Sequence, residues 1–192
     1  MSDLTVGFAL TGSYCTFSKV MPEMERVVKN GFNVIPIMSE NVQKTDTRFG
    51  KAEDFKKMAE DICKNKIIKS IAEAEPIGPK KLIDALIIAP CTGNTLAKLT
   101  YGITDTTVTM AAKSTLRNER PVIIAVSTND GLGNACKNIG TLLNQRNLYF
   151  VPFNQDDCVK KPRSLVADME KIYDTLKNAL DGKQIQPIIY KN

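Results

Sequence analysis

The residues of this chain that could do chemistry begin with a small polar turn at residues 91–95, which reads CTGNT. The turn follows a continuous apolar run at residues 86–89, the pattern of a strand buried on both faces, and Pro90 ends that run because proline cannot donate to a ladder. Leu96 and Leu99 then resume at helical spacing. The unpaired amides and partial positive charge of a helix N-terminus form an anion site. An ordinary strand-to-helix turn is the alternative interpretation.

Two other predicted strands also end in residues that carry hydroxyl groups. An apolar run at residues 4–10 leads to Gly12 and Ser13, and a second run at residues 33–38 leads to Ser39. A hydroxyl at such a position is more commonly a helix cap. Hydroxyls and amides at two strand ends are also the arrangement with which an open α/β sheet binds ligands.

A fourth polar segment and two cations complete the set of candidate residues. Ser127 and Asn129 follow the apolar strand predicted at residues 122–126, so their loop could lie beside the first turn. Arg48 could bind a carboxylate through two parallel hydrogen bonds, which would suit a dicarboxylate substrate. Lys98 could contact the substrate or a subunit interface. A solvent-facing loop arginine and a solvated helical lysine are the alternatives.

The chain contains no histidine, which excludes several classes of chemistry. No Ser–His or Cys–His nucleophile pair and no imidazole base can exist, so proton transfer must use Asp, Glu, Lys, Tyr, Cys or a cofactor. No catalytic residue is assigned. The five cysteines are widely spaced without a Cys-x-x-Cys pair, so we expect reduced thiols and neither a disulfide framework nor a metal site.

Composition and charge narrow the class of protein further. A chain of 192 residues with 43% hydrophobic residues predicts one domain, residues 1–192, with a substantial core. The net charge of +5 is spread among interleaved acids and bases without a basic block, so nucleic-acid binding is not expected. No segment approaches the length of an apolar membrane span and the first residues lack a signal-peptide pattern, so we expect a cytoplasmic protein.

Helices are predicted between the strands, which makes βαβ units with parallel strands and a three-layer, doubly wound α/β fold. Residues 41–50 are polar and aperiodic and predict a loop. A last strand is predicted at residues 148–153 and an amphipathic helix, core or subunit contact, at residues 165–180. The other predicted helices cover residues 17–28, 55–62, 107–116 and 132–143.

Residues 90–98 (PCTGNTLAK) and 102–105 (GITD) resemble the Pro-x-Ser/Thr-Ala/Gly-Asn-Thr…Lys…Gly-Ile-x-Asp signature of the FMN-binding flavoprotein family. The resemblance implies a Rossmann-like or flavodoxin-like flavoprotein fold with FMN as cofactor. Members that decarboxylate cysteine carry a Pro-x-Met-Asn clamp, of which only Asn129 matches here, and an active-site histidine that this chain lacks. Cysteine decarboxylation is therefore not expected. The cofactor-binding residues that the resemblance implies are Gly12, Ser13, Ser39, Pro90, Thr92, Gly93, Asn94, Thr95 and Ser127.

Other segments are similar to the flavoprotein-type subunits of enzymes that oxidise a dihydro- or tetrahydropyridine dicarboxylate to pyridine-2,6-dicarboxylate during sporulation. This similarity implies a dehydrogenase-like partner subunit that carries NADP, a trimer or a multiple of trimers, and a location in the mother cell. Two alternatives stay open: an FMN-dependent decarboxylase or flavin prenyltransferase-like protein, and a non-catalytic assembly or electron-transfer subunit. The segments are residues 7–13 (GFALTGS), 45–50 (TDTRFG), 74–80 (AEPIGPK), 110–113 (MAAK) and 127–130 (STND).

Overall fold

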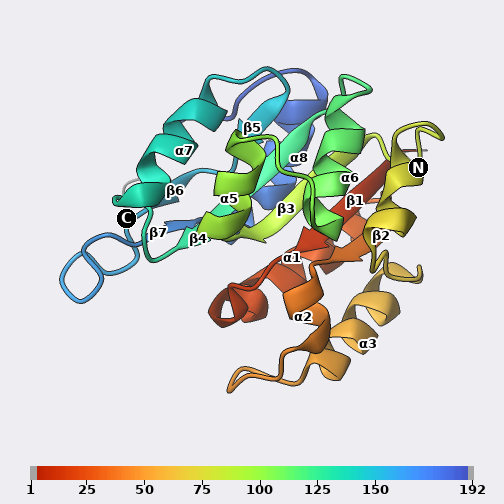
Figure 1. The fold of residues 1–192 in the computed structure, drawn as a ribbon, viewed down its shortest axis with the longest axis horizontal. Coiled ribbons are helices and arrows are strands. Elements are labelled where there is room, and N and C mark those ends of the chain that lie inside the picture. Colours follow the sequence, from red (N-terminus) through yellow and green to blue (C-terminus); the bar gives the residue numbers. More distant parts are fainter. Residues whose placement is uncertain (1–3, 190–192) are drawn as a thin grey trace.

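A computed structural model describes residues 4–189 and shows an open sheet whose five parallel strands stand in the order β2-β1-β3-β4-β5 (Figure 1). This order reverses direction between β1 and β3, as in flavodoxin-like folds. The prediction of a doubly wound, mainly parallel sheet is confirmed. The parallel strands are β1 (Thr5–Leu10), β2 (Asn33–Met38), β3 (Ala85–Cys91), β4 (Val122–Thr128) and β5 (Leu148–Phe150).

Helices cover both faces of the sheet, because right-handed crossovers that run in opposite directions along a sheet lie on opposite faces (Figure 1). One layer contains α1 (Phe17–Lys29), α3 (Ala52–Cys63) and α8 (Ile172–Leu180), and α1 contacts both of the others. The other layer contains α5 (Gly93–Thr100), α6 (Thr107–Leu116) and α7 (Asn134–Leu143). Shorter helical segments are α2 (Glu40–Lys44), α4 (Ile71–Ala74), η1 (Tyr14–Thr16), η2 (Glu75–Ile77) and η3 (Met169–Lys171).

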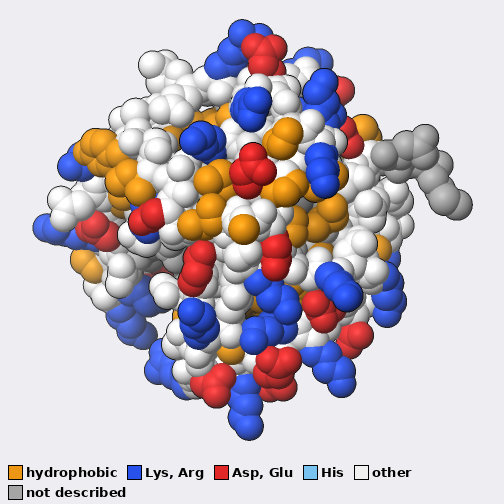
Figure 2. All heavy atoms as spheres, turned by 45° about the vertical axis from the view of Figure 1, so that its right-hand side comes forward, with side chains coloured by type: hydrophobic (Ala, Val, Ile, Leu, Met, Phe, Trp, Pro, Cys, Tyr) orange, Lys and Arg blue, Asp and Glu red, His pale blue; other side chains and the backbone are white. Residues whose placement is uncertain are grey.

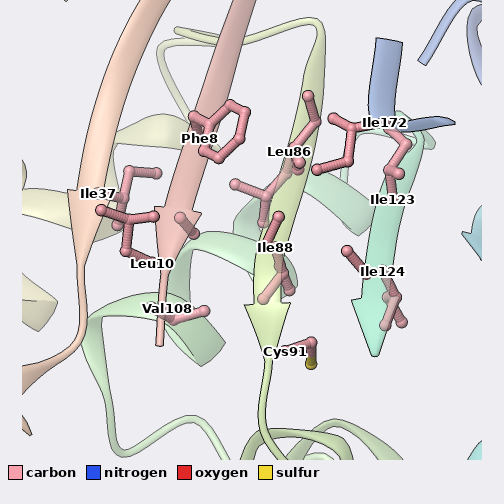
Figure 3. Packing of buried hydrophobic residues seen from close by; sticks show 14 of the residues in the cluster. Phe8, Leu10, Ile37, Leu86, Ile88, Cys91, Val108, Ile123, Ile124 and Ile172 are labelled. Carbon is pink, nitrogen blue, oxygen red and sulfur yellow. The ribbon is translucent and has the colours of Figure 1, made fainter. Parts of the chain in front are cut away.

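The core lies on both sides of the central strands. Every residue of β3 is buried, as its continuous apolar run predicts, and Leu86 and Ile88 have no exposed surface. Figure 3 shows their side chains between those of Phe8 on β1 and Ile123 on β4. This packing fixes the positions of the strand ends, on which the candidate site depends.

The prediction that the central strand stops at Pro90 was wrong. Strand β3 continues to Cys91, the Ala89–Pro90 peptide is cis, and the pairing of β3 with β4 shifts register between Ile88 and Cys91. A register shift leaves ladder positions unpaired, so a residue without an N–H group can occupy one. The polar loop after the strand therefore begins one residue later than predicted, at Thr92.

Four other predicted boundaries were also wrong. Residues 41–50 are not all loop, because α2 occupies their first part. Strand β4 continues through Ser127 and Thr128, which pair with a short antiparallel strand, β7 (Leu165–Ala167). The predicted helix at residues 165–180 therefore starts late: Asp168 accepts a hydrogen bond from the Glu170 N–H and starts η3, which leads into α8. The predicted last strand divides into β5 and β6 (Phe153–Asn154).

Other parts of the chain hydrogen-bond both edges of the sheet. At the β5 edge, the Gln184 side chain accepts from the Phe150 N–H at 2.8 Å and donates to the Phe150 oxygen at 2.7 Å. At the β2 edge, Ile68 donates its N–H to the Pro36 oxygen at 2.9 Å and accepts from the Met38 N–H at 3.1 Å. At the other edge, β6 and β7 form a short antiparallel pair beyond the end of β4.

Charged side chains of both signs are interspersed over the face shown in Figure 2, with hydrophobic side chains between them. Across residues 4–189, no helix combines the length and the apolar character needed to cross a membrane. In the same part of the chain, no three Cys, Asp or Glu side chains are grouped closely enough to hold a metal ion.

Candidate functional site

The ends of β1 and β3 are joined by the side chain of Thr11, which directly follows β1. Its hydroxyl donates to the Pro90 oxygen at 2.6 Å and accepts from the Thr92 N–H at 3.1 Å. Thr11 is only 2% exposed, so water does not compete freely for these two hydrogen bonds. The first and third strands therefore end side by side, at the point where the strand order reverses.

The helix that leaves β3 presents its N-terminus at this point. Thr92 caps α5, since its hydroxyl accepts from the Thr95 N–H at 3.3 Å and lies 3.1 Å from the Thr95 hydroxyl. The N–H groups of Gly93 and Asn94 lie in the first turn, where a helix offers them no internal acceptor. Asn94 is thus not the cap of its helix, and its exposed side chain is available to a ligand.

A strand-end cleft of about 410 Å³ lies between these groups. It falls within the range of ligand-binding pockets. Gly12 and Ser39 enter it from the ends of β1 and β2, and Lys98 enters from the last turn of α5. Six of the residues predicted from sequence are therefore brought together there. The lining consists of Thr11, Gly12, Ser39, Glu40, Asn41, Thr92, Asn94, Thr95, Lys98, Asp105 and Thr106.

Ser39 carries a buried hydroxyl that has no hydrogen-bond partner among the residues that the structure describes. It stands at the N-cap position of α2, yet its side chain does not cap that helix. A buried polar atom without a partner is uncommon in folded proteins and calls for a ligand or an ordered water. Its place in the wall of the strand-end cleft makes it a fitting donor to a polar ligand there.

Two carboxylates of the strand-end cleft are already engaged by other groups. Glu40 accepts from the N–H of Thr107 at 2.9 Å and from its hydroxyl at 2.8 Å, at the start of α6. Asp105 accepts from the Lys98 ammonium at 2.6 Å, and this hydrogen bond lowers the pKa of the Asp105 carboxyl below its ordinary value. Because both negative charges face donors, the free amides of α5 remain available to an anion.

Ser13 and Ser127 hydrogen-bond each other instead of lining the cleft, with 2.7 Å between their hydroxyl oxygens. They join the loop after β1 to the end of β4, and neither caps α1. A Cβ added at Gly93 would lie 2.9 Å from the Thr128 hydroxyl, so glycine allows α5 to approach β4 closely. Pro90 does not line the cleft, but its backbone oxygen accepts the hydrogen bond of Thr11 that joins the ends of β1 and β3.

Arg48 and Asn129 do not line the strand-end cleft. Arg48 is exposed between α2 and α3, with its guanidinium carbon 4.8 Å from the ring centroid of its neighbour Phe49. Asn129 is exposed in the turn that follows β4. Sequence reasoning missed Thr11 and Glu40 as site residues. The only available signal was that each stands next to a predicted strand-end residue.

All five cysteines are free thiols, of which two are buried and three are exposed. Burial raises the pKa of the Cys63 thiol to about 12 and raises that of Cys91 further. A thiol needs its thiolate form to act as a nucleophile, so neither buried cysteine has a catalytic environment. The exposed ones, Cys15, Cys136 and Cys158, lie outside the strand-end cleft.

A polar crevice at the point where the strand order of an open α/β sheet reverses is the ligand site of the flavodoxin-like class, which includes FMN-binding proteins. Residues 1–178 match the model of the Flavoprotein family. The chain therefore belongs to the flavoprotein family.

Individual relatives are closely similar along the whole chain. The dipicolinate synthase B subunit of Bacillus subtilis (strain 168) is 46% identical over 187 residues, which cover 97% of this chain and 94% of the relative. The crystal structure of the dipicolinate synthase B subunit from Bacillus halodurans C is 44% identical, with a TM-score of 0.92 over 100% of this chain and 98% of that one. The resemblance inferred from the sequence is confirmed.

A more distant neighbour shares the fold alone. Burkholderia xenovorans DmrB, crystallised in complex with FMN, is 16% identical, with a TM-score of 0.68 over 93% of this chain and 96% of that one.

Proposed function

We propose that this chain is the flavin-binding subunit of a dipicolinate synthase. Together with the dehydrogenase-like A subunit of that enzyme, which carries NADP, it would oxidise a dihydro- or tetrahydropyridine dicarboxylate to pyridine-2,6-dicarboxylate. The observation that carries the proposal is the 46% identity to a dipicolinate synthase B subunit along 97% of this chain. The strand-end cleft is the observation that favours FMN as the cofactor. The expected location of the protein is the cytoplasm of the mother cell of a sporulating bacterium.

The residues of the strand-end cleft fit FMN. The free amides of Gly93 and Asn94 at the N-terminus of α5 would receive the phosphate, which is the chemistry that helix N-termini offer to anions. The hydroxyls of Thr92 and Thr95 border the same helix end, and the unpartnered Ser39 hydroxyl would donate to the phosphate or the ribityl chain. A bound flavin supplies hydride and electron transfer, whereas the protein supplies binding and orientation.

The cofactor proposal is tested by titrating the purified chain with FMN and following the flavin absorbance and fluorescence, with and without the dehydrogenase-like partner. We expect a shifted absorbance spectrum, quenched fluorescence and flavin retained on gel filtration. A chain that retains no flavin under either condition would remove FMN from the proposal. Light scattering on the same samples tests the expected trimer or multiple of trimers.

The oxidation is tested by assaying the two subunits separately and together with the reduced pyridine dicarboxylate. We expect pyridine-2,6-dicarboxylate only from the mixture. Product formation at the full rate by the dehydrogenase-like partner without this chain would favour a non-catalytic role for this chain. Release of carbon dioxide from a peptidyl cysteine would favour the decarboxylase alternative, which the absence of histidine opposes.

A further inference from the structure

A second hollow of about 470 Å³ lies between α5 and α6, next to the strand-end cleft. This α5–α6 pocket has an apolar floor of Leu99, Ile103 and Leu116. Lys98 lines both it and the strand-end cleft, so the Lys98–Asp105 ion pair stands between the two hollows. A ligand held in the α5–α6 pocket would therefore be a direct neighbour of whatever occupies the cleft.

The charges that face the α5–α6 pocket are all positive. Lys113 lies in the last turn of α6 and Arg117, four positions later, is the C-cap residue of that helix, and no carboxylate is part of the lining. Within residues 4–189, neither side chain has a hydrogen-bond or ion-pair partner, whereas Lys98 is paired with Asp105. Two like charges at this spacing repel each other on a helix surface. An anion between them would replace that repulsion by two attractions.

The position of these cations near the end of α6 has a purely local explanation, because a helix C-terminus favours positive charge. That explanation accounts for a cation in the last turn. It does not account for the apolar floor beneath the pair or for a lining without any acid. A pocket with apolar contacts and a few convergent charges is instead the usual form of a small-molecule site.

We propose that the α5–α6 pocket binds a planar aromatic dicarboxylate, the product class of the proposed function, on which the choice of ligand rests. One carboxylate lies on the Arg117 guanidinium, which can bind it through two parallel hydrogen bonds, and the other lies on the Lys113 ammonium. The ring covers Leu99, Ile103 and Leu116. Two cations match two carboxylates, and the floor favours a flat ring over a flexible chain.

The test is calorimetric titration of the full chain with pyridine-2,6-dicarboxylate in metal-free buffer, with FMN affinity measured separately on the same preparations. In the variant Lys113→Gln/Arg117→Gln we expect dicarboxylate affinity to fall at least about tenfold, because the charge-assisted hydrogen bonds to both carboxylates are lost. The matched control, Lys137→Gln/Arg146→Gln, removes the same charge from exposed residues outside both hollows and should bind as the parent does. Arg117→Lys should lie between them, and pyridine-2-carboxylate should bind the parent more weakly.

Equal losses in the double variant and its control would overturn the proposal, as would the absence of any titration heat or displaceable binding in the parent chain. Circular dichroism of the variants separates lost binding from lost folding, and the Arg117→Lys variant provides a second measurement if the double variant unfolds. Failure of the proposed function can be distinguished from failure of the pocket proposal. In that case FMN is not retained or no product forms, while dicarboxylate binding still depends on Lys113 and Arg117.

Discussion

Replacing Thr11 by valine tests how the site is assembled, because valine has nearly the same shape but no hydroxyl. The substitution removes the hydrogen bond to Pro90 and leaves the Thr92 N–H without its acceptor. The lost bond to Pro90 costs about 1 kcal/mol net, and the Thr92 amide left unpaired in a partly buried place costs about 1–3 kcal/mol. We therefore expect Thr11→Val to lower the free energy of unfolding by about 2–4 kcal/mol.

Urea unfolding of both proteins at one protein concentration measures this loss. Thr141→Val is the matched control, because the exposed Thr141 hydroxyl bonds only the Lys137 oxygen of its own helix and should change stability by less than about 0.5 kcal/mol. FMN affinity should also fall, since the ends of β1 and β3 lose their connection. A Thr11→Val protein as stable as the control, with unchanged FMN affinity, would refute the role given to Thr11.

Three further outcomes are expected. Ser39→Ala should weaken FMN binding about tenfold while leaving the urea midpoint unchanged, because the lost hydroxyl has no partner among the described residues. The control Ser18→Ala, on the exposed surface, should change neither FMN affinity nor the urea midpoint. The Lys98 ammonium holds the pKa of Asp105 below its unfolded value of about 3.9. The destabilisation by Asp105→Asn should therefore be present at neutral pH and disappear as the pH falls through the folded pKa of Asp105. A difference in urea midpoint that does not change with pH would contradict this. Iodoacetamide followed by mass spectrometry should leave Cys63 unlabelled until urea is added, because burial keeps it a thiol, and early labelling contradicts its burial. The thiols labelled in the native protein should be Cys15, Cys136 and Cys158.

The fold could be predicted in large part because its signals are local and repeated. Continuous apolar runs such as residues 86–89 and 122–126 belong to strands buried on both faces, and α6 has the bounds predicted for it. Boundaries failed where distant pairing overrode the local pattern. Leu165 fits a helical stripe by spacing, yet its segment pairs with the end of β4 and becomes a strand.

The position of the strand-end cleft and part of its lining could be predicted from the order of the strands, whereas other lining residues could not. Gly12, Ser39 and Asn94 were found because the carboxyl ends of parallel strands share one edge of the sheet. Thr11 and Glu40 act on groups 79 and 67 residues away, and no sequence pattern specifies such contacts. Arg48 was chosen by residue type, and a pattern does not fix the direction of an exposed loop side chain.

The covered edges of the sheet limit how this protein can associate. An open strand edge is a template for pairing with another chain, but Ile68 bonds the β2 edge near Pro36. The edge strands on the opposite side, β5 and β6, have only three and two residues. Neither edge offers a long row of free backbone groups to a neighbour. We therefore expect further copies of the chain, or a partner subunit, to dock on helices and loops rather than to extend the sheet, and we expect little tendency to aggregate edge to edge.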